Sequence, residues 1–316
     1  MKIKLSLILF LMLALSSCQT DTKRSQAEPK KEPVMTTPSW PAPPPEVDQP
    51  VLDGTKAGST VHEGPAISVA GQRPRLALIL GPGGLRSFAH AGLLQEIAKA
   101  KIPVYWIAGL EMGSLPASLF ALKGQPFEAE WQMMKLKQED FLKSGLLSGA
   151  VPLKVGTLEE PLKLMFGGAR VEDAKIPFMC SSYSISKRQT FLMNRGSFAQ
   201  LLVYCLPAEP LYSTSQGTGA NPLALAPLAQ AARAKGAQLL VYVDLLTDNA
   251  VNENELGFQW GIFQQSLESQ SHQVNEVFRV GGLSGLRAFD KRREMLQKGQ
   301  EAGRKLVQLL QTKYGY

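Results

Sequence analysis

Residues 104–113, VYWIAGLEMG, are the most informative stretch of this chain for predicting its fold. Its apolar half has the length and composition of a buried strand, and the segment Gly109-Leu110-Glu111-Met112-Gly113 has the spacing of a nucleophile elbow. Such a turn joins a strand to a helix and lifts its central side chain above a sheet. Glutamate stands where a nucleophilic serine would be. A carboxylate is a weak nucleophile toward carboxyl esters and has no proton for a base to remove, so the sequence predicts a hydrolase scaffold without hydrolase chemistry.

Short apolar runs and amphipathic segments alternate on both sides of the elbow. We expect strands at residues 76–80, 104–108 and 239–243, and helices at residues 89–99, 114–122, 227–235, 256–270 and 291–311. This alternation favours an α/β fold with a mainly parallel central sheet and helices on both faces. The segment from about Arg75 to the C-terminus, about 240 residues, suits one domain.

The N-terminus resembles the signal of a bacterial lipoprotein. Two lysines precede an apolar run at residues 5–15, which is shorter than the ~20 residues of a membrane-spanning helix. Small residues lead directly to Cys18, as in the lipobox, whose cysteine receives lipid. We therefore expect residues 1–17 to be a signal peptide and the lipid on Cys18 to anchor the chain; an ordinary secretory signal is the alternative. Gln19 resembles lipoproteins sorted to the outer membrane, facing the periplasm.

The composition changes between residues 18 and 74, where Pro, Ser, Thr, Lys and Glu dominate and few side chains could pack a core. We expect residues 18–74 to comprise the lipidated Cys18 and a disordered, Pro-rich tether. The formal net charge of the whole chain is +7, but the sequence has no compact basic stripe with interleaved aromatic residues. Nucleic acid is therefore not an expected partner.

Cysteine and histidine spacing indicates no metal site. The three cysteines and three histidines lack the spacing of zinc ligands, and no motif calls for a cofactor. Cys180 and Cys205 both fall in apolar segments, which favours buried, unpaired thiols. The alternative is a disulfide between them, if the protein lies in an oxidising compartment.

Four motifs in order resemble the patatin-like phospholipase family. The segment LILGPGGLRSFAHAG at residues 78–92 is similar to the family's glycine-rich opening, a Gly-Gly-Gly-x-Arg-Gly oxyanion loop followed by a helix, and the elbow follows at the family's distance. QGTGANPL at residues 216–223 resembles its Asp-Gly-Gly/Ala segment, and FDKRR at residues 289–293 resembles the entry to its C-terminal helix. The resemblance implies a three-layer α/β/α patatin-like domain over residues 75–316.

The resemblance also implies which residues would carry chemistry. In that family a Ser-Asp dyad hydrolyses acyl esters of lipids. Glu111 occupies the serine position and Gln216 the aspartate position, and the amide of Gln216 cannot act as a general base. Both members of the dyad are therefore expected to be missing.

The glycine loop departs from the family pattern at two positions. In the family the backbone amides of this loop stabilise the oxyanion. Pro82 stands at the first glycine and has no N–H to donate, and Ser87 replaces the last one. Gly83, Gly84 and Arg86 match the pattern.

We expect the Glu111 carboxylate to stay ionised and to occupy the former oxyanion region, with Arg86 or His90 as its partner. The N-terminus of a helix favours an anion there by roughly 0.3–1 kcal/mol. A strongly raised pKa would contradict this expectation. Ser114 as a substitute nucleophile, and Glu111 with Asp244 as paired carboxylates, are weaker hypotheses.

The function expected from the sequence is that of a membrane-anchored, non-catalytic protein that binds a lipid or fatty-acyl ligand or an envelope protein. Two alternatives stay open. One is an active lipid acyl hydrolase with an unrecognised nucleophile, and the other is an envelope scaffold in which the cleft is closed.

Overall fold

The computed structural model describes residues 73–141, 156–209, 211, 214, 217–247 and 257–316. They belong to a compact unit that spans Thr55–Tyr316, and a second unit, Met1–Gly54, lies outside the described residues. The expected signal peptide, Cys18, the tether to residue 72 and Gln216 also lie outside them. In the described part of the chain, no helix is both long and apolar enough to cross a bilayer.

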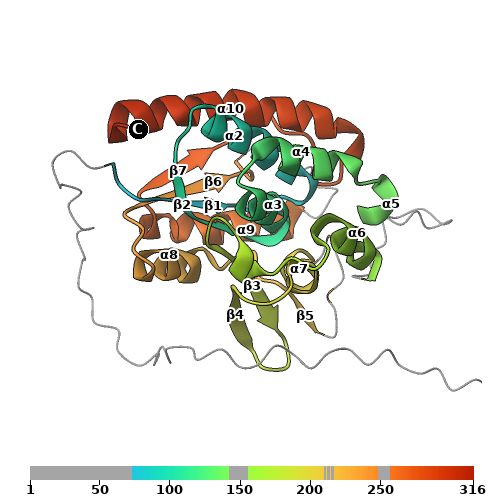
Figure 1. The fold of residues 1–316 in the computed structure, drawn as a ribbon. Helices are drawn as coiled ribbons and strands as arrows, with labels where there is room; N and C mark the ends of the chain where they lie inside the picture. Colours follow the sequence, from blue (N-terminus) through green and yellow to red (C-terminus); the bar gives the residue numbers. More distant parts are fainter. Residues whose placement is uncertain (1–72, 142–155, 210, 212–213, 215–216, 248–256) are drawn as a thin grey trace, which may run out of the picture. The chain divides into compact units, whose positions relative to one another are not determined.

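One seven-stranded sheet forms the centre of the compact unit (Figure 1). Its strands are β1 (Leu76–Leu80), β2 (Val104–Gly109), β3 (Phe178–Ser184), β4 (Gln189–Met193), β5 (Thr218–Ala220), β6 (Leu239–Asp244) and β7 (Glu276–Arg279). The order is β4-β3-β2-β1-β6-β7, and β5 also pairs with β3. The pairs β1–β2, β1–β6, β2–β3 and β6–β7 are parallel, whereas β4 and β5 run antiparallel to β3. The expectation of a mainly parallel sheet is confirmed.

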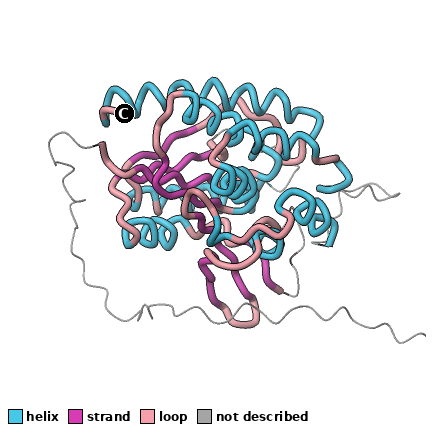
Figure 2. The backbone as a smooth tube through the Cα atoms, viewed as in Figure 1, coloured by secondary structure: helices cyan, strands magenta, loops and turns pink. Residues whose placement is uncertain are grey.

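Helices cover both faces of this sheet (Figures 1 and 2). The α-helices are α2 (Phe88–Lys99), α3 (Ser114–Lys123), α4 (Pro126–Lys135), α5 (Gln138–Phe141), α6 (Gly156–Phe166), α7 (Phe198–Cys205), α8 (Leu225–Ala234), α9 (Gly257–Ser269) and α10 (Arg292–Tyr314). The 3-10 helices are η1 (Gly84–Ser87), η2 (Glu111–Gly113), η3 (Val171–Asp173), η4 (Ser271–Gln273) and η5 (Phe289–Lys291). Helices α2, α4 and α10 pack together on one side, and α8 and α9 lie on the other (Figure 1).

The central strands are buried because both of their faces carry apolar side chains. All five residues of β1 are 0% exposed, and all six residues of β6 are buried. A parallel strand covered by helices on both sides has no solvent face, so it reads as a continuous apolar run rather than an alternating one. This is why these two strands, together with β2, were predictable from the sequence.

Helices α2 and α10 approach each other so closely that glycine is required where they meet. A Cβ atom on Gly92 would lie 2.1 Å from the carbonyl oxygen of Leu296, and one on Gly299 would lie 1.9 Å from that of Ala89. Both distances are far inside van der Waals contact. The long C-terminal helix is thereby fixed against the helix that follows the glycine loop.

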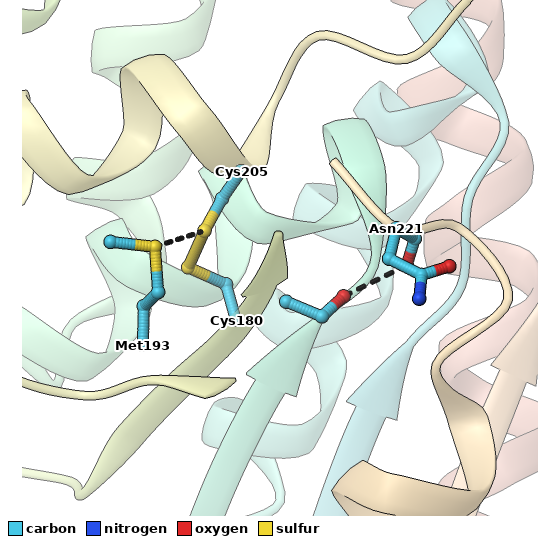
Figure 3. The surroundings of a disulfide bond; sticks show 5 residues. Cys180, Met193, Cys205 and Asn221 are labelled. Carbon is cyan, nitrogen blue, oxygen red and sulfur yellow. Dashed lines mark hydrogen bonds between the residues drawn. A yellow bond between two sulfur atoms is a disulfide. The ribbon is translucent and has the colours of Figure 1, made fainter. Parts of the chain in front are cut away.

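The disulfide in Figure 3 corrects one expectation. Cys180 at β3 and Cys205 at the end of α7 are bonded, with their Cα atoms 6.1 Å apart, so the favoured interpretation of unpaired thiols is wrong. Both residues are 0% exposed, and the sulfur of Met193 lies 3.9 Å from that of Cys205. Apolar surroundings suit a buried disulfide as well as a thiol, so composition alone could not separate the two.

Candidate functional site

The elbow at the end of β2 is held by two glycines that no other residue could replace without movement. A Cβ on Gly109 would lie 2.2 Å from the Cα of Ser114, and one on Gly113 would lie 2.5 Å from the carbonyl oxygens of Leu80 and Gly81. Between them Glu111 has a φ of 50°, a left-handed conformation that is uncommon for a side-chain-bearing residue and occurs at functional turns. The chain thus turns from β2 into η2 and α3 with the Glu111 side chain directed back over the sheet.

The Glu111 carboxyl group binds the glycine loop, residues 81–84. Its Oε2 atom accepts hydrogen bonds from the backbone N–H of Gly83 at 3.0 Å and of Gly84 at 2.9 Å. Gly84 begins η1, which runs directly into α2, so these donors lie at the N-terminus of a helical segment, where an anion is favoured. The side chain is 0% exposed.

Burial dominates the ionisation of this carboxyl group. It raises the pKa of Glu111 to about 7, although hydrogen bonds from the amides of Gly83, Gly84 and Met112 oppose the shift. Oε1 is buried and has no hydrogen-bond partner in the described part of the chain. The location expected for the carboxyl group is therefore found at the loop amides, but the expectation that it stays ionised is wrong. Near pH 7 its neutral and charged forms are similarly populated.

Arg86 does not pair with Glu111. Its Nε donates to the carbonyl oxygen of Ser284 at 2.7 Å, and its Nη1 donates to that of Leu245 at 2.8 Å. The guanidinium is 0% exposed, and it links the glycine loop to the end of β6 and to the segment that precedes α10. Its role here is to hold three parts of the chain together, because each carbonyl needs a donor once it is removed from water.

His90 has a structural partner too. Its ring Nε2 lies 2.9 Å from the carbonyl oxygen of Gly81, so the neutral ring carries its proton on that nitrogen and donates it. Burial lowers the pKa of His90 to about 4, against the raising effect of this bond. The histidine is therefore neutral at pH 7 and braces the start of the glycine loop.

Two leucines cover the glycine loop. A Cβ on Gly84 would lie 2.7 Å from the carbonyl oxygen of Leu286 and 2.9 Å from Cδ1 of Leu211, and the N–H of Leu85 donates to that same Leu286 oxygen at 2.8 Å. Leu211 and Leu286 are themselves 3% and 2% exposed. Neither contact could be predicted from the sequence, since both depend on how distant segments return to the loop.

Four further site residues were predicted: Pro82, Ser114, Asp244 and Gln216. Pro82 is buried within the loop and has no N–H to offer. The Oγ of Ser114 is buried without a hydrogen-bond partner in the described residues. Asp244 accepts a hydrogen bond from the N–H of Leu246 at 2.8 Å, and burial raises its pKa. Gln216 is among the residues the structure leaves undescribed.

Two cavities among the described residues have linings that do not include Glu111. One, of about 200 Å³, lies beside β5 and includes Tyr183, Asn221 and Phe263 in its lining. The other, of about 20 Å³, lies between β6 and α9 and is lined in part by Tyr242 and Asp244; this is enough for a single water molecule. Among the described residues no group of three or more His, Cys, Asp or Glu side chains is arranged to hold a metal ion.

Several known proteins are similar in sequence to part of this chain. An uncharacterized NTE family protein of Mycobacterium tuberculosis is 26% identical over 125 residues, which cover 39% of this chain and 34% of that protein. A patatin-like phospholipase domain-containing protein of Caenorhabditis elegans is 28% identical over 141 residues, 41% of this chain and 10% of that protein. Lysophospholipase NTE1 of Coccidioides immitis is 25% identical over 126 residues, 38% of this chain and 8% of that protein. The chain thus spans about a third or less of the length of these relatives.

Solved structures resemble it more distantly. The type III effector protein ExoU matches with 14% identity and a TM-score of 0.46 over 76% of this chain and 54% of that one. VipD from Legionella pneumophila matches with 10% identity and a TM-score of 0.45 over 75% of this chain and 67% of that one.

The family model described as patatin-like phospholipase matches residues 78–244. That range begins in β1, contains the glycine loop and the elbow, and ends with the last residue of β6. It covers more than half of the chain. The chain therefore belongs to the patatin-like phospholipase family.

Proposed function

We propose that this protein is a non-catalytic member of its family, anchored in the bacterial envelope, which binds a membrane or protein partner instead of hydrolysing lipid esters. The observation that carries the proposal is the contact of Glu111 with the N–H groups of Gly83 and Gly84. In the family these amides would stabilise the oxyanion of an ester under attack. Here they are engaged by the side chain that stands in place of the nucleophile.

The chemistry of Glu111 supports the absence of turnover. An ester carbonyl would have to displace the carboxyl group from both amides before they could stabilise a developing negative charge. A displaced carboxylate would still be a poor nucleophile toward a carboxyl ester. The general base is the second requirement, and Gln216 at the corresponding position has no titratable group.

Ser114 is the nearest serine to the elbow, and its surroundings do not favour an active hydrolase. A nucleophilic serine is activated by a base within hydrogen-bond reach, and the Ser114 Oγ has no such partner in the described part of the chain. The complete burial of Glu111, and the close approach of Leu211 and Leu286 to Gly84, also argue against an acyl chain at the elbow. Binding is therefore assigned to the outer surface.

The disulfide supports the proposed location. Disulfides form and persist in oxidising compartments and are rare in the cytosol, and Cys180 is bonded to Cys205. This agrees with export, lipidation at Cys18 and residence at the outer membrane facing the periplasm. Labelling with a radioactive fatty acid in a bacterial host should mark the wild-type protein and leave a Cys18→Ala variant unmarked; equal labelling of both would contradict the anchor.

An ester assay tests the central claim. Residues 19–316, which include the whole compact unit, should show no turnover of short-chain esters or of phospholipid above buffer, and a fluorophosphonate probe should label no serine. A Ser114→Ala variant serves as the matched control. Turnover that this substitution abolishes would overturn the proposal and establish an active hydrolase.

A further inference from the structure

The cavity of about 200 Å³ beside β5 is walled by parts of the chain that are distant in sequence. Tyr183 belongs to β3, Glu209 and Thr214 to the segment between α7 and β5, Gly219 to β5, and Phe263 to α9. A cavity of roughly 150 Å³ is large enough for a molecule of benzene. The cavity can therefore hold a small ligand.

The sheet brings a carboxylate towards Tyr183. Tyr183 is paired with Gly219 across β3 and β5, so both residues face the same side of the sheet. Because Gly219 has no side chain, Thr214 packs there: a Cβ on Gly219 would lie 2.5 Å from Cγ2 of Thr214. The hydroxyl group of Thr214 donates a hydrogen bond to Glu209 at 3.4 Å. This series of contacts places the Glu209 carboxylate and the Tyr183 ring in one wall of the cavity.

Two aromatic rings line the cavity, Tyr183 and Phe263. The Phe263 ring makes an edge contact with Trp260, with the centroids 5.3 Å apart, and Trp260 is 1% exposed, so the core holds Phe263 in place. In the described part of the chain no lysine or arginine stacks on either ring. Aromatic rings that enclose a pocket attract a cation through their faces, and here that cation would have to come from a ligand.

The charge of the lining favours a cation as well. Glu209 is its single charged residue, and this exposed carboxylate forms no ion pair with the described residues. Lys187 is near in sequence, but its ammonium group lies 5.5 Å from the centroid of the Phe191 ring and is not part of the lining. The Asn221 amide does line the cavity, yet its nitrogen donates to Thr190 within the fold. The lining therefore attracts positive charge and repels anions.

The apolar part of the lining selects a methylated cation over a primary ammonium group. A primary ammonium group is strongly hydrated and needs acceptors for three N–H bonds, whereas much of this wall is aliphatic. A trimethylammonium group has no N–H bond, presents methyl groups to its surroundings, and is smaller than benzene. The aliphatic surface is supplied by Ile185, Ala208, Ala220, Pro222 and Leu223.

We propose that this cavity binds a trimethylammonium group, with the cation against the rings of Tyr183 and Phe263 and its charge balanced by Glu209. Tyr183 is 37% exposed and Glu209 is exposed, so the rest of the ligand extends into solvent. A soluble quaternary amine and the headgroup of phosphatidylcholine both carry this group. The proposal makes no use of Glu111, so it stands or falls separately from the proposed loss of catalysis.

Ligand-observed NMR with choline as the probe tests the site. Residues 19–316 should bind choline with a Kd of about 1 mM, and the uncharged analogue in which carbon replaces the nitrogen should bind at least about tenfold more weakly. Tyr183→Ala and Glu209→Gln should each weaken choline binding at least about fivefold, whereas Tyr183→Phe keeps the ring and should keep the affinity. Trp131→Ala is the matched control, because Trp131 is an aromatic residue, 59% exposed, outside the cavity, and its replacement should leave binding unchanged.

Vesicle flotation separates the two sources of the group. Flotation with phosphatidylcholine vesicles that choline displaces and Tyr183→Ala abolishes would support the site and assign it to a lipid headgroup; choline binding without flotation would support it and assign it to a soluble amine. Circular dichroism should show that each variant keeps the wild-type fold. No choline binding at about 50 mM, equal affinity for the uncharged analogue, or wild-type affinity in folded Tyr183→Ala and Glu209→Gln would each overturn the proposal.

Discussion

The Oε2 atom of Glu111 lies 2.9 Å from the backbone nitrogen of Gly84, so the side chain at the centre of the elbow is bound to the N-terminus of the helical segment that the elbow faces. One side chain thus stands at the centre of the elbow and accepts hydrogen bonds from the backbone amides opposite it. The pairing joins the ends of β1 and β2 through a buried titratable group, and most of its consequences can be measured.

The first prediction concerns pH and Glu111→Gln. Burial raises the pKa of Glu111 from 4.5 to about 7, so the folded protein binds this proton more tightly than the unfolded chain does. Ionisation therefore lowers the stability of the wild type as pH rises from about 4.5 through about 7, by on the order of 3 kcal/mol in all. Glutamine keeps the accepting oxygen and cannot ionise.

Urea unfolding of both proteins at several pH values measures the effect. The stability of Glu111→Gln relative to wild type should increase by on the order of 3 kcal/mol between about pH 4.5 and pH 8. His90 acts in the opposite direction: its pKa is lowered to about 4, so its contribution is lost as pH falls from about 6.5 through 4. The Glu111→Gln variant should therefore be less stable at pH 4 than at pH 6.5. A constant difference between the two proteins would contradict the raised pKa of Glu111.

Glu111→Ser should not create an esterase. The substitution frees the amides of Gly83 and Gly84 and supplies a hydroxyl group, but Gln216 still provides no base. We expect no ester turnover above background in a direct assay. The double variant with Gln216→Asp is the fairer test of the dyad, and activity in the single variant would show that the base lies elsewhere.

Removal of the disulfide should lower the free energy of unfolding and leave the other contacts of the folded protein in place. The bond joins residues 25 apart in sequence, and closing a loop of that size is worth about 2–4 kcal/mol through the unfolded state. Cys180→Ser should lower the free energy of unfolding by this amount in non-reducing urea titrations. Cys18→Ser, which removes the third cysteine, is the control, and it should leave the midpoint unchanged.

Gly299→Ala should be far more damaging than an ordinary glycine replacement. Its Cβ would lie 1.9 Å from the backbone oxygen of Ala89, so α2 and α10 would have to separate, at a cost of about 3 kcal/mol or more. Gly261→Ala in α9 is the matched control, since nothing lies within 4 Å of its Cβ position, and alanine there should stabilise by about 0.5–1 kcal/mol. Equal thermal midpoints for the two variants would contradict the close packing of α2 on α10.

The central strands and most of the helices around them could be predicted from the sequence. Strands β1, β2 and β6 and helices α2, α3, α8, α9 and α10 lie close to their expected bounds, because apolar periodicity reports burial directly. Strands β3 and β4 were not predicted. Ser181, Ser182 and Ser184 dilute the apolar pattern of β3, and β4 is only partly buried at the sheet edge.

The candidate site likewise has features that could be predicted from the sequence and features that could not. The elbow and the glutamate at its centre are properties of the sequence, because Gly109 and Gly113 are needed wherever a strand turns this sharply into a helix. The long-range contacts depend on the folded chain: they are those of Glu111 with Gly83 and Gly84, of Arg86 with Ser284 and Leu245, and of Cys180 with Cys205. Local spacing fixes backbone conformation, whereas desolvation and long-range partners depend on which distant segments pack over a residue, and these set both its pKa and its contacts.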